Sequence, residues 1–264
     1  MSRPSPVTTI HGHGLGWVPS DPHHPDSHRP LLATAPIPVP ETIDLSADMG
    51  PVLNQGSIGC CTAAATSSLV MHAHITGKQK DFTPSMLFNY WFSRKRLGWQ
   101  NVDQGSTCAN ALASAVNEGI CAQDQPIKGQ WVFDPAKVNV EPTEDAIIAA
   151  QHHRANWHWG VQADAAHIAQ ALAHGYPVQF GMTVYSGFYQ YWETGIVPLP
   201  VAHDTVEGGH SMVICGLDQA RQLWLVKNSW GPLNPAGTCP YPGYLWLPMS
   251  YPVWDCWVVA RESS

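Results

Sequence analysis

The stretch Asn54-Gln55-Gly56-Ser57-Ile58-Gly59-Cys60-Cys61-Thr62-Ala63-Ala64-Ala65 places two cysteines where a glycine-broken loop meets an apolar, alanine-rich run. We expect a helix to begin there, so that the unpaired N–H groups of its first turn and the positive end of its dipole favour a thiolate. Gln55 precedes Cys61 by six residues and can donate its side-chain amide to a developing oxyanion. A nucleophile and an oxyanion donor in one segment predict acyl-transfer chemistry.

Two later segments supply the groups that such a nucleophile needs. His210 follows two glycines and precedes an apolar run, and Asn228 lies within Trp224-Leu225-Val226-Lys227-Asn228-Ser229-Trp230-Gly231. A base must take the thiol proton and return it to the leaving amine, and an acceptor must fix the tautomer of that base. We therefore interpret His210 as the base and Asn228 as the group that orients it.

Cys61, His210 and Asn228 occur in the chain order and approximate spacing of papain-type proteases, and the chain resembles the papain-like cysteine peptidases. The segment 55–61 matches the oxyanion-glutamine and nucleophile motif of that family. Gly209-His210 matches its general base, and 227–231 matches its orienting asparagine with the covering tryptophan. The resemblance runs from about residue 43 to near the C-terminus. It implies the catalytic set Cys61, His210, Asn228 and Gln55.

Two departures from the family pattern are visible. Ile58 and Asp103 stand where the family usually has a bridged pair of cysteines, and Thr62 stands where it usually has a tryptophan. That disulfide therefore cannot form here. In these details the chain is more similar to bacterial members than to plant or lysosomal ones.

The resemblance also implies the substrate-binding residues. It aligns Gly105, Ser106 and Cys108 with the main specificity pocket of the family and sets a glycine pair across from them. Because none of these residues is charged, we expect an apolar or small side chain two positions before the scissile bond. The substrate-binding residues predicted in this way are Gly105, Ser106, Cys108, Gly208, Gly209 and Trp230.

Sequence patterns predict an α+β fold in which helices come first and strands follow. Thr83 is predicted to cap the second helix, with Pro84 at its first position. The resemblance implies two lobes, a helical one over 43–160 and a strand-rich, β-barrel-like one over 161–264, with the active site in the cleft between them. The predicted helices are 61–76, 85–97, 106–118, 143–154 and 163–174, and the predicted strands are 177–184, 211–216, 223–227, 244–247 and 257–260.

Residues 1–42 differ from the rest of the chain because they are rich in proline and histidine. Proline at this density disfavours helices and central strands, so we expect an extended arm on the surface. Members of the resembled family commonly keep an N-terminal segment over the cleft, which makes the arm a candidate pro-segment and intramolecular inhibitor of a zymogen. The alternative is a tail or packing strap without any regulatory effect.

Composition excludes several other classes of function. A net charge of −7 and the lack of basic runs argue against nucleic acid as a partner. No apolar stretch is long enough to cross a membrane, and no signal peptide is visible, which predicts a cytoplasmic protein or export by a leaderless route. Seven cysteines without regular spacing indicate mostly reduced thiols.

The predicted function is a thiol protease that hydrolyses peptide or protein substrates without a cofactor. For Cys61 the alternative is a small buried hydrophobic residue, and Cys60 is a rival nucleophile. Two further alternatives keep the fold: a catalytically silent scaffold that binds peptides, and an acyltransferase or transpeptidase that uses the same site. A metal site is also conceivable in the arm, although it lacks rigidity. Its candidate ligands are His11, His13, His23, His24 and His28.

Overall fold

The protein is described here from a computed structural model of the 264-residue chain, in which residues 7–23, 36–79, 82–123, 128–234 and 237–260 are described. The helices are α1 (Cys61–Thr76), α2 (Met86–Lys95), α3 (Cys108–Asn117), α4 (Glu144–Ala150), α5 (Ala165–Ala173) and α6 (Tyr191–Thr194). The strands are β1 (Thr8–Ile10), β2 (His13–Leu15), β3 (Thr42–Asp44), β4 (Trp157–Val161), β5 (Val178–Tyr185), β6 (Val206–Asp218), β7 (Leu223–Lys227), β8 (Tyr244–Pro248) and β9 (Trp254–Ala260).

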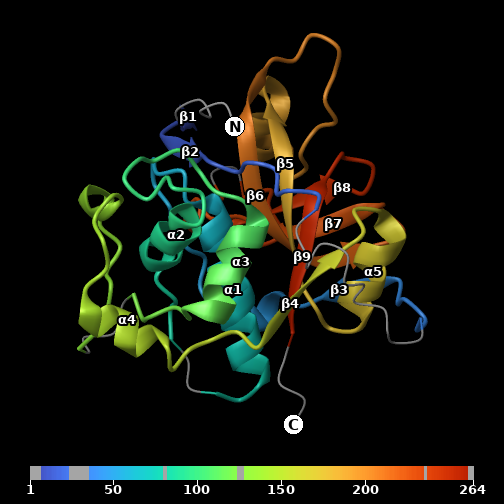
Figure 1. Cartoon of the computed structure of the whole chain (residues 1–264). Coiled ribbons are helices and arrows are strands. Elements are labelled where there is room, and N and C mark those ends of the chain that lie inside the picture. Colours follow the sequence, from blue (N-terminus) through green and yellow to red (C-terminus); the bar gives the residue numbers. More distant parts are fainter. Residues whose placement is uncertain (1–6, 24–35, 80–81, 124–127, 235–236, 261–264) are drawn as a thin grey trace.

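Helices α1 to α4 lie on one side of the molecule and the strands of the larger sheet on the other, as the α+β prediction requires (Figure 1). Helices α1, α2 and α3 pack against one another, and α1 also packs against β6 (Figure 1). The larger sheet has the order β4-β9-β5-β6-β7-β8, with β3 paired to β6, and its pairings are antiparallel. Helix α5 packs on β5 and β6. This arrangement confirms the two-lobed papain-like architecture.

Strand β6 connects the two hydrophobic cores because both of its faces are buried. Val213 and Cys215 belong to the core that contains α1, α2 and α3, whereas Met212 and Ile214 belong to the core between the sheet and α5. Side chains alternate between the two faces of a strand, so an unbroken apolar run suits a strand covered on both sides. The predicted base, His210, lies on this same strand, which is covered on both faces.

Several predicted elements match the structure, and others do not. The predicted bounds of α1 and β7 are those observed. The prediction for the start of α2 was wrong: Ser85 is the N-cap and accepts a hydrogen bond from Phe88 N at 3.2 Å, while Pro84 forms an isolated bridge with Ala122. Helix α4 ends at Ala150, before the predicted end at residue 154.

Strand β4 was not predicted, because its segment WHWGV lacks a run of β-branched residues. It pairs with β9, and the predicted lobe boundary between residues 160 and 161 falls inside it. Strand β3 pairs with β6 in the same sheet, although its first residue, Thr42, is the last residue of the predicted arm. The sequence boundaries therefore only approximate the two lobes.

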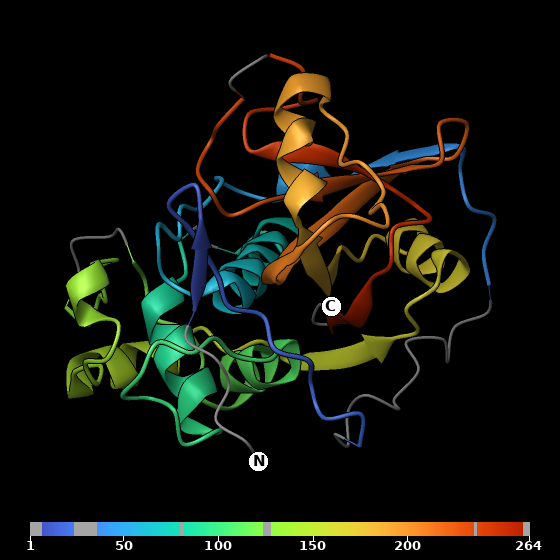
Figure 2. The ribbon, with the colours of Figure 1, turned by 90° about the horizontal axis from the view of Figure 1, so that it is seen from above.

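The described part of the arm is not confined to the surface. Strands β1 and β2 form a hairpin whose turn, His11-Gly12, has positive φ at both residues, as a two-residue turn of this kind requires. From the end of the hairpin the chain enters the protein, so that Leu15 is 3% and Trp17 is 9% exposed. Figure 2 shows this dark-blue segment running between the green helices and the orange and red strands.

Candidate active site

Cys61 is the first residue of α1, where the sequence places the nucleophile. Its side chain is fully buried, and burial raises the pKa of its thiol to about 11. Backbone N–H groups of Gly16, Ser211 and Thr62 act in the opposite direction on this pKa. The sulfur therefore faces β6 and the arm.

Cys60, the rival nucleophile, faces a different environment. Burial raises the pKa of its thiol, Asp103 raises it further, and Arg94 opposes the shift. These neighbours lie on or beside α2, within the helical lobe. Cys60 therefore lies away from His210, in agreement with its interpretation as a packed residue.

His210 lies on β6 and its Nε2 is 2.9 Å from Asn228 Oδ1, at the end of β7. Within the described residues, His210 Nδ1 is buried without a hydrogen-bond partner. That nitrogen is the one left to exchange a proton with a nucleophile. Trp230 stacks against the His210 ring at a centroid distance of 4.8 Å and shields it from solvent.

Gln55 is fully buried and its amide is held at both ends. Its Nε2 donates to the carbonyl oxygens of Gly14 at 3.0 Å and Ile58 at 2.8 Å. Its Oε1 accepts from Ser229 Oγ at 2.6 Å, and this bond fixes which end of the amide is the donor. The sequence prediction did not include Ser229, although it is the direct neighbour of Asn228.

Lys227 ties the segment before Gln55 to the sheet. Its buried ammonium group donates to the carbonyl oxygens of Met49 at 2.7 Å, Gly50 at 3.1 Å and Pro51 at 2.7 Å. Burial lowers the pKa of Lys227 to about 7. Consecutive residues of one segment thus hold the loop before Gln55 (Lys227), the predicted base His210 (Asn228) and the predicted oxyanion donor Gln55 (Ser229).

The protonation states of the pair follow from its burial. Burial lowers the pKa of His210 to about 4, opposed by the hydrogen bond to Asn228 and assisted by His13. With the thiol pKa raised to about 11, Cys61 and His210 are both neutral near pH 7. A buried pair avoids the thiolate–imidazolium state because burial disfavours both charges.

The predicted substrate-binding residues line the channel that the arm occupies. Gly105 lies so close to the arm that a Cβ there would come within 2.0 Å of Gly16 O. Ser106 N donates to Gly16 O at 2.9 Å, and Trp17 N donates to Gly209 O at 3.0 Å. The arm therefore runs between the helical lobe and β6.

The other predicted contact residues lie in the same region. Gly208 packs against Leu15, and Trp230 stacks on His13 at 4.8 Å. Cys108, at the first position of α3, lies deeper, with its Sγ 3.5 Å from Ser211 Oγ. The arm thus contacts Gly105, Ser106, Gly208, Gly209 and Trp230, whereas Cys108 lies behind them.

Asp103 makes a connection where the family disulfide is missing. Its carboxylate accepts from Gly59 N at 3.2 Å and from the Tyr90 phenol hydroxyl at 2.5 Å. Tyr90 OH in turn accepts from Gly105 N at 2.8 Å. These hydrogen bonds join the loop before Cys61 to the loop that carries Gly105. The seven cysteines are free in this structure.

The described residues contain no group of three or more His, Cys, Asp or Glu side chains placed to hold a metal ion. His11 packs edge-on against Tyr189 and His13 stacks on Trp230, while His24 and His28 lie outside the described residues. No helix in the described part of the chain has the length and apolar character needed to span a membrane.

This arrangement defines the class of protein: a two-lobed α+β chain with a Cys-His-Asn site and a glutamine amide beside it. The family profile described as "Papain family cysteine protease" matches residues 39–237. The chain belongs to the papain family of cysteine proteases.

Curated relatives support this membership over much of the chain. An uncharacterised peptidase C1-like protein of Acanthamoeba polyphaga mimivirus is 30% identical over 190 residues, which is 68% of this chain and 60% of that protein. Pro-cathepsin H of Bos taurus is 28% identical over 194 residues, 69% of this chain and 52% of the relative. The matches thus span between 52% and 60% of these two relatives.

The similarity to solved structures extends over a larger share of the chain. Xylellain, a cysteine protease from the bacterium Xylella fastidiosa, superposes with a TM-score of 0.80 at 27% identity, over 97% of this chain and 99% of that chain. A procathepsin B from Trypanosoma congolense gives a TM-score of 0.64 at 16% identity, over 99% of this chain and 87% of that chain, and so shares the fold.

Proposed function

We propose that the protein is a cysteine endopeptidase whose cleft is closed by its own N-terminal arm. The observation that carries the first part is the shared geometry of the site. Cys61 begins a helix, His210 is oriented by Asn228, and the Gln55 amide is oriented by Ser229. Each group that thioester chemistry needs is present and held by a partner.

In the proposed reaction the Cys61 thiolate attacks the peptide carbonyl carbon, and the Gln55 amide and Cys61 N–H stabilise the resulting oxyanion. His210 holds the proton that came from the thiol and transfers it to the leaving amine, which leaves a thioester on Cys61. Water then attacks the thioester while His210 accepts its proton. The acid is released and the thiol is regenerated.

Latency is supported by what lies against these groups. Gly14 O accepts the hydrogen bond of Gln55 Nε2, and the N–H of Gly16 faces the Cys61 sulfur. Attack requires the carbonyl carbon at the sulfur and the oxygen of that same carbonyl at the amide. Here two different peptide units occupy the two positions, so the arm fills the site without presenting a scissile bond to it.

The arm also pairs with the backbone of the channel. Trp17 forms a parallel bridge with Ser106, and Val18 N donates to Ser106 O at 3.0 Å. The arm thus uses the backbone groups of the channel on both sides, including Gly209 O. A substrate needs these groups, so we propose that the arm must leave before a substrate can bind.

The test uses the full chain, folded intact, with a recognition site for a sequence-specific protease inserted between Pro30 and Leu31. After cleavage the arm is separated by gel filtration to give the released chain. Both forms are incubated with an epoxysuccinyl inhibitor and mapped by peptide mass, and peptide hydrolysis is measured in parallel. Cys61→Ala in both forms is the control for labelling elsewhere.

We expect one adduct, on Cys61, together with hydrolysis in the released chain and little of either in the intact chain. Equal labelling of both forms would leave the peptidase assignment standing and refute the latch. No adduct and no hydrolysis in either form would refute the peptidase assignment and favour the silent scaffold.

A further inference from the structure

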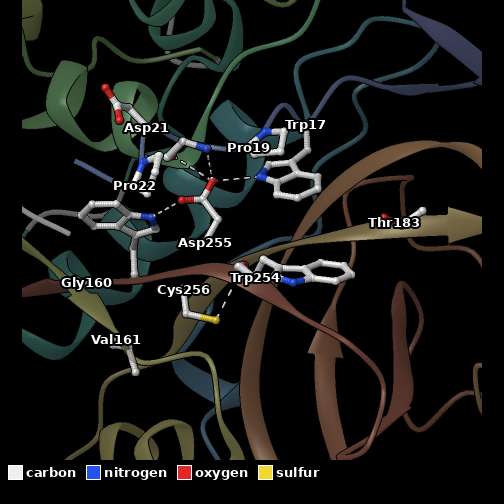
Figure 3. Close-up of a pocket in the computed structure, with 12 residues that line it drawn as sticks. Trp17, Pro19, Asp21, Pro22, Gly160, Val161, Thr183, Trp254, Asp255 and Cys256 are labelled. Atoms are coloured by element: carbon white, nitrogen blue, oxygen red, sulfur yellow. Dashed lines mark hydrogen bonds between the residues drawn. The ribbon is translucent and has the colours of Figure 1, made fainter. Parts of the chain in front are cut away.

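The pocket that holds Trp17 contains a carboxylate that the predicted substrate-binding set lacks. Asp255 lies in β9, at a residue with φ of 56°, next to an irregularity in the pairing of β5 with β9. Its carboxylate projects into the pocket drawn in Figure 3, toward the indole of Trp17. Aspartate is among the residues that tolerate left-handed backbone, which lets β9 aim this side chain inward.

Most of the hydrogen bonds recorded for this carboxylate come from the arm. Asp255 Oδ2 accepts from Trp17 Nε1 at 2.9 Å, from Ser20 Oγ at 2.9 Å and from Ser20 N at 3.2 Å. Its Oδ1 accepts from Trp257 Nε1 at 2.7 Å. No ion pair is recorded for Asp255 within the described residues. When the arm leaves, Oδ2 loses these three donors.

The pocket is shaped for a large side chain at the position of Trp17. A Cβ at Gly181 would lie 2.0 Å from Trp17 Cε2, and one at Gly209 would lie 2.8 Å from Trp17 Cε3. A cavity of about 580 Å³ extends between the arm and the sheet, and its sheet side includes Gly160, Val161, Thr183 and Cys256. The walls on that side are largely apolar, so a carboxylate there needs donors.

Trp254 offers a flat surface beside the carboxylate. It is 44% exposed and stacks on Trp17 with a ring-centroid distance of 6.4 Å and an angle of 13°. A guanidinium group stacks on aromatic faces and binds a carboxylate through paired N–H donors, whereas an ammonium group does only the second well.

We infer that, in the released protease, this pocket binds an arginine side chain of the substrate, with the guanidinium on Asp255 and against Trp254. The inference rests on the proposed peptidase function and identifies its substrate class: peptides with arginine where the arm has Trp17. It replaces the expectation of an apolar or small side chain, which considered only uncharged residues. Asp255 is then a specificity-determining residue, and Trp17 imitates the substrate by donating a hydrogen bond without a charge.

The test compares peptide amides that differ only two positions before the scissile bond, the position expected for the pocket that includes Gly209, on which Trp17 packs. Arginine, citrulline, leucine and tryptophan are compared in the released chain by kcat/KM. Citrulline has the shape of arginine without its charge. We expect arginine to exceed citrulline and leucine by about 10- to 100-fold, the range for a charge-assisted hydrogen bond.

The protein counterpart is Asp255→Asn, which keeps the acceptor for Trp257 and tolerates the left-handed backbone. We expect it to remove most of the advantage of arginine over citrulline. Asp218→Asn makes the same charge change at the end of β6, on a carboxylate near Arg221, and serves as the matched control. It should leave the order of substrates unchanged.

A binding measurement separates this inference from the peptidase assignment. Titration of the released Cys61→Ala chain with the same peptides by calorimetry needs no turnover. Tighter binding of arginine than citrulline, lost in Asp255→Asn, would support the pocket assignment even if no peptide is cleaved. Equal binding of the arginine and citrulline peptides would overturn the pocket assignment even if hydrolysis is observed. A preference for tryptophan or leucine that is unchanged in Asp255→Asn would overturn it as well.

Discussion

In the proposed mechanism, Ser229 acts on the oxyanion through Gln55. Its hydroxyl donates to Gln55 Oε1 at 2.6 Å, and its carbonyl accepts from Gln55 N at 2.9 Å. An amide can rotate so that its oxygen faces the substrate, which would place an acceptor where a donor is needed. The hydroxyl prevents this rotation, so Ser229 is a positioning residue.

Ser229→Ala should lower kcat of the released chain about tenfold with little change in KM, because the bond matters most when the oxyanion forms. Gln55→Ala sets the upper limit, a loss of about 10²–10³ in kcat. Steady-state kinetics on both variants provides the measurement. A Ser229→Ala variant with the parental kcat would show that packing alone orients the amide.

The charge state of the catalytic pair should change when the arm leaves. In the closed chain burial raises the pKa of Cys61 to about 11 and lowers that of His210 to about 4. Removing the arm exposes both groups to water and so removes part of the burial that shifts their pKa values. We therefore expect iodoacetamide to alkylate Cys61 of the intact chain slowly near neutral pH and rapidly only at strongly alkaline pH.

In the released chain the alkylation rate should already be high near neutral pH, where a thiolate–imidazolium pair can form. Alkylation at Cys61, followed by peptide mass, provides this comparison, with Asn228→Ala to show the contribution of the base. Identical pH profiles for the intact and released chains would contradict the prediction.

The arm and the loop before α1 form a close backbone-to-backbone contact. Gly14 and Gly16 face the carbonyls of Ile58 and Gly59, and a Cβ would lie 2.2 Å from Ile58 O at Gly14 and 2.0 Å from Gly59 O at Gly16. Glycine is needed at both positions to let the two backbones approach. The fit of the arm in the channel therefore depends on the two glycines, which allow the close backbone contact, as well as on the packing of Trp17.

Gly16→Ala should force the arm out of the channel, because rigid backbone atoms cannot move away as a side chain can. We expect the rate of Cys61 alkylation in the intact chain to rise at least tenfold, toward that of the released chain. Thr9→Ala, at an exposed residue of the same arm, is the matched control and should have no effect. A Gly16→Ala chain as slow as the parent would show that the arm does not limit access.

At the scale of the whole molecule, we expect the proposed closing of the arm to couple to protonation through His13. Burial lowers the pKa of His13 from 6.5, and His11 lowers it further. The pKa values of His210 and Cys61 are shifted as well. On release of the arm, however, His210 gains the proton that Cys61 loses. Between these two pKa values the pair therefore exchanges few protons with the solvent. His13, which stacks on Trp230, is left as the group in the site that takes up a proton.

A lowered pKa in the closed form means that His13 favours closure fully above about pH 6.5 and loses this effect as the pH falls through its lowered value. We therefore expect acid to favour release, measured as protease sensitivity of the arm between pH 7 and pH 4. His13→Gln should flatten this dependence, and His203→Gln, at an exposed loop residue, should not. A dependence that is equally steep in His13→Gln would assign it to other groups.

The sequence alone determined the features that are local or follow from a repeating pattern. Helix α1 and strand β7 begin and end where glycine, cap and apolar-run signals place them, and Gln55, Cys61, His210 and Asn228 were chosen from motifs of a few residues. The apolar segment of β6 also predicted a strand. Local chemistry and periodicity are sufficient for such features.

Only the tertiary structure decided which distant residues meet. Nothing in the sequence pairs Asp255 with Trp17 and Ser20, which are separated from it by 238 and 235 residues, or Ser229 with Gln55, at 174. Nor does proline content show that the arm enters the channel, because that depends on two glycines meeting the backbone of another segment. Such contacts follow from how the two lobes and the arm pack, and packing joins residues without regard to their distance along the chain.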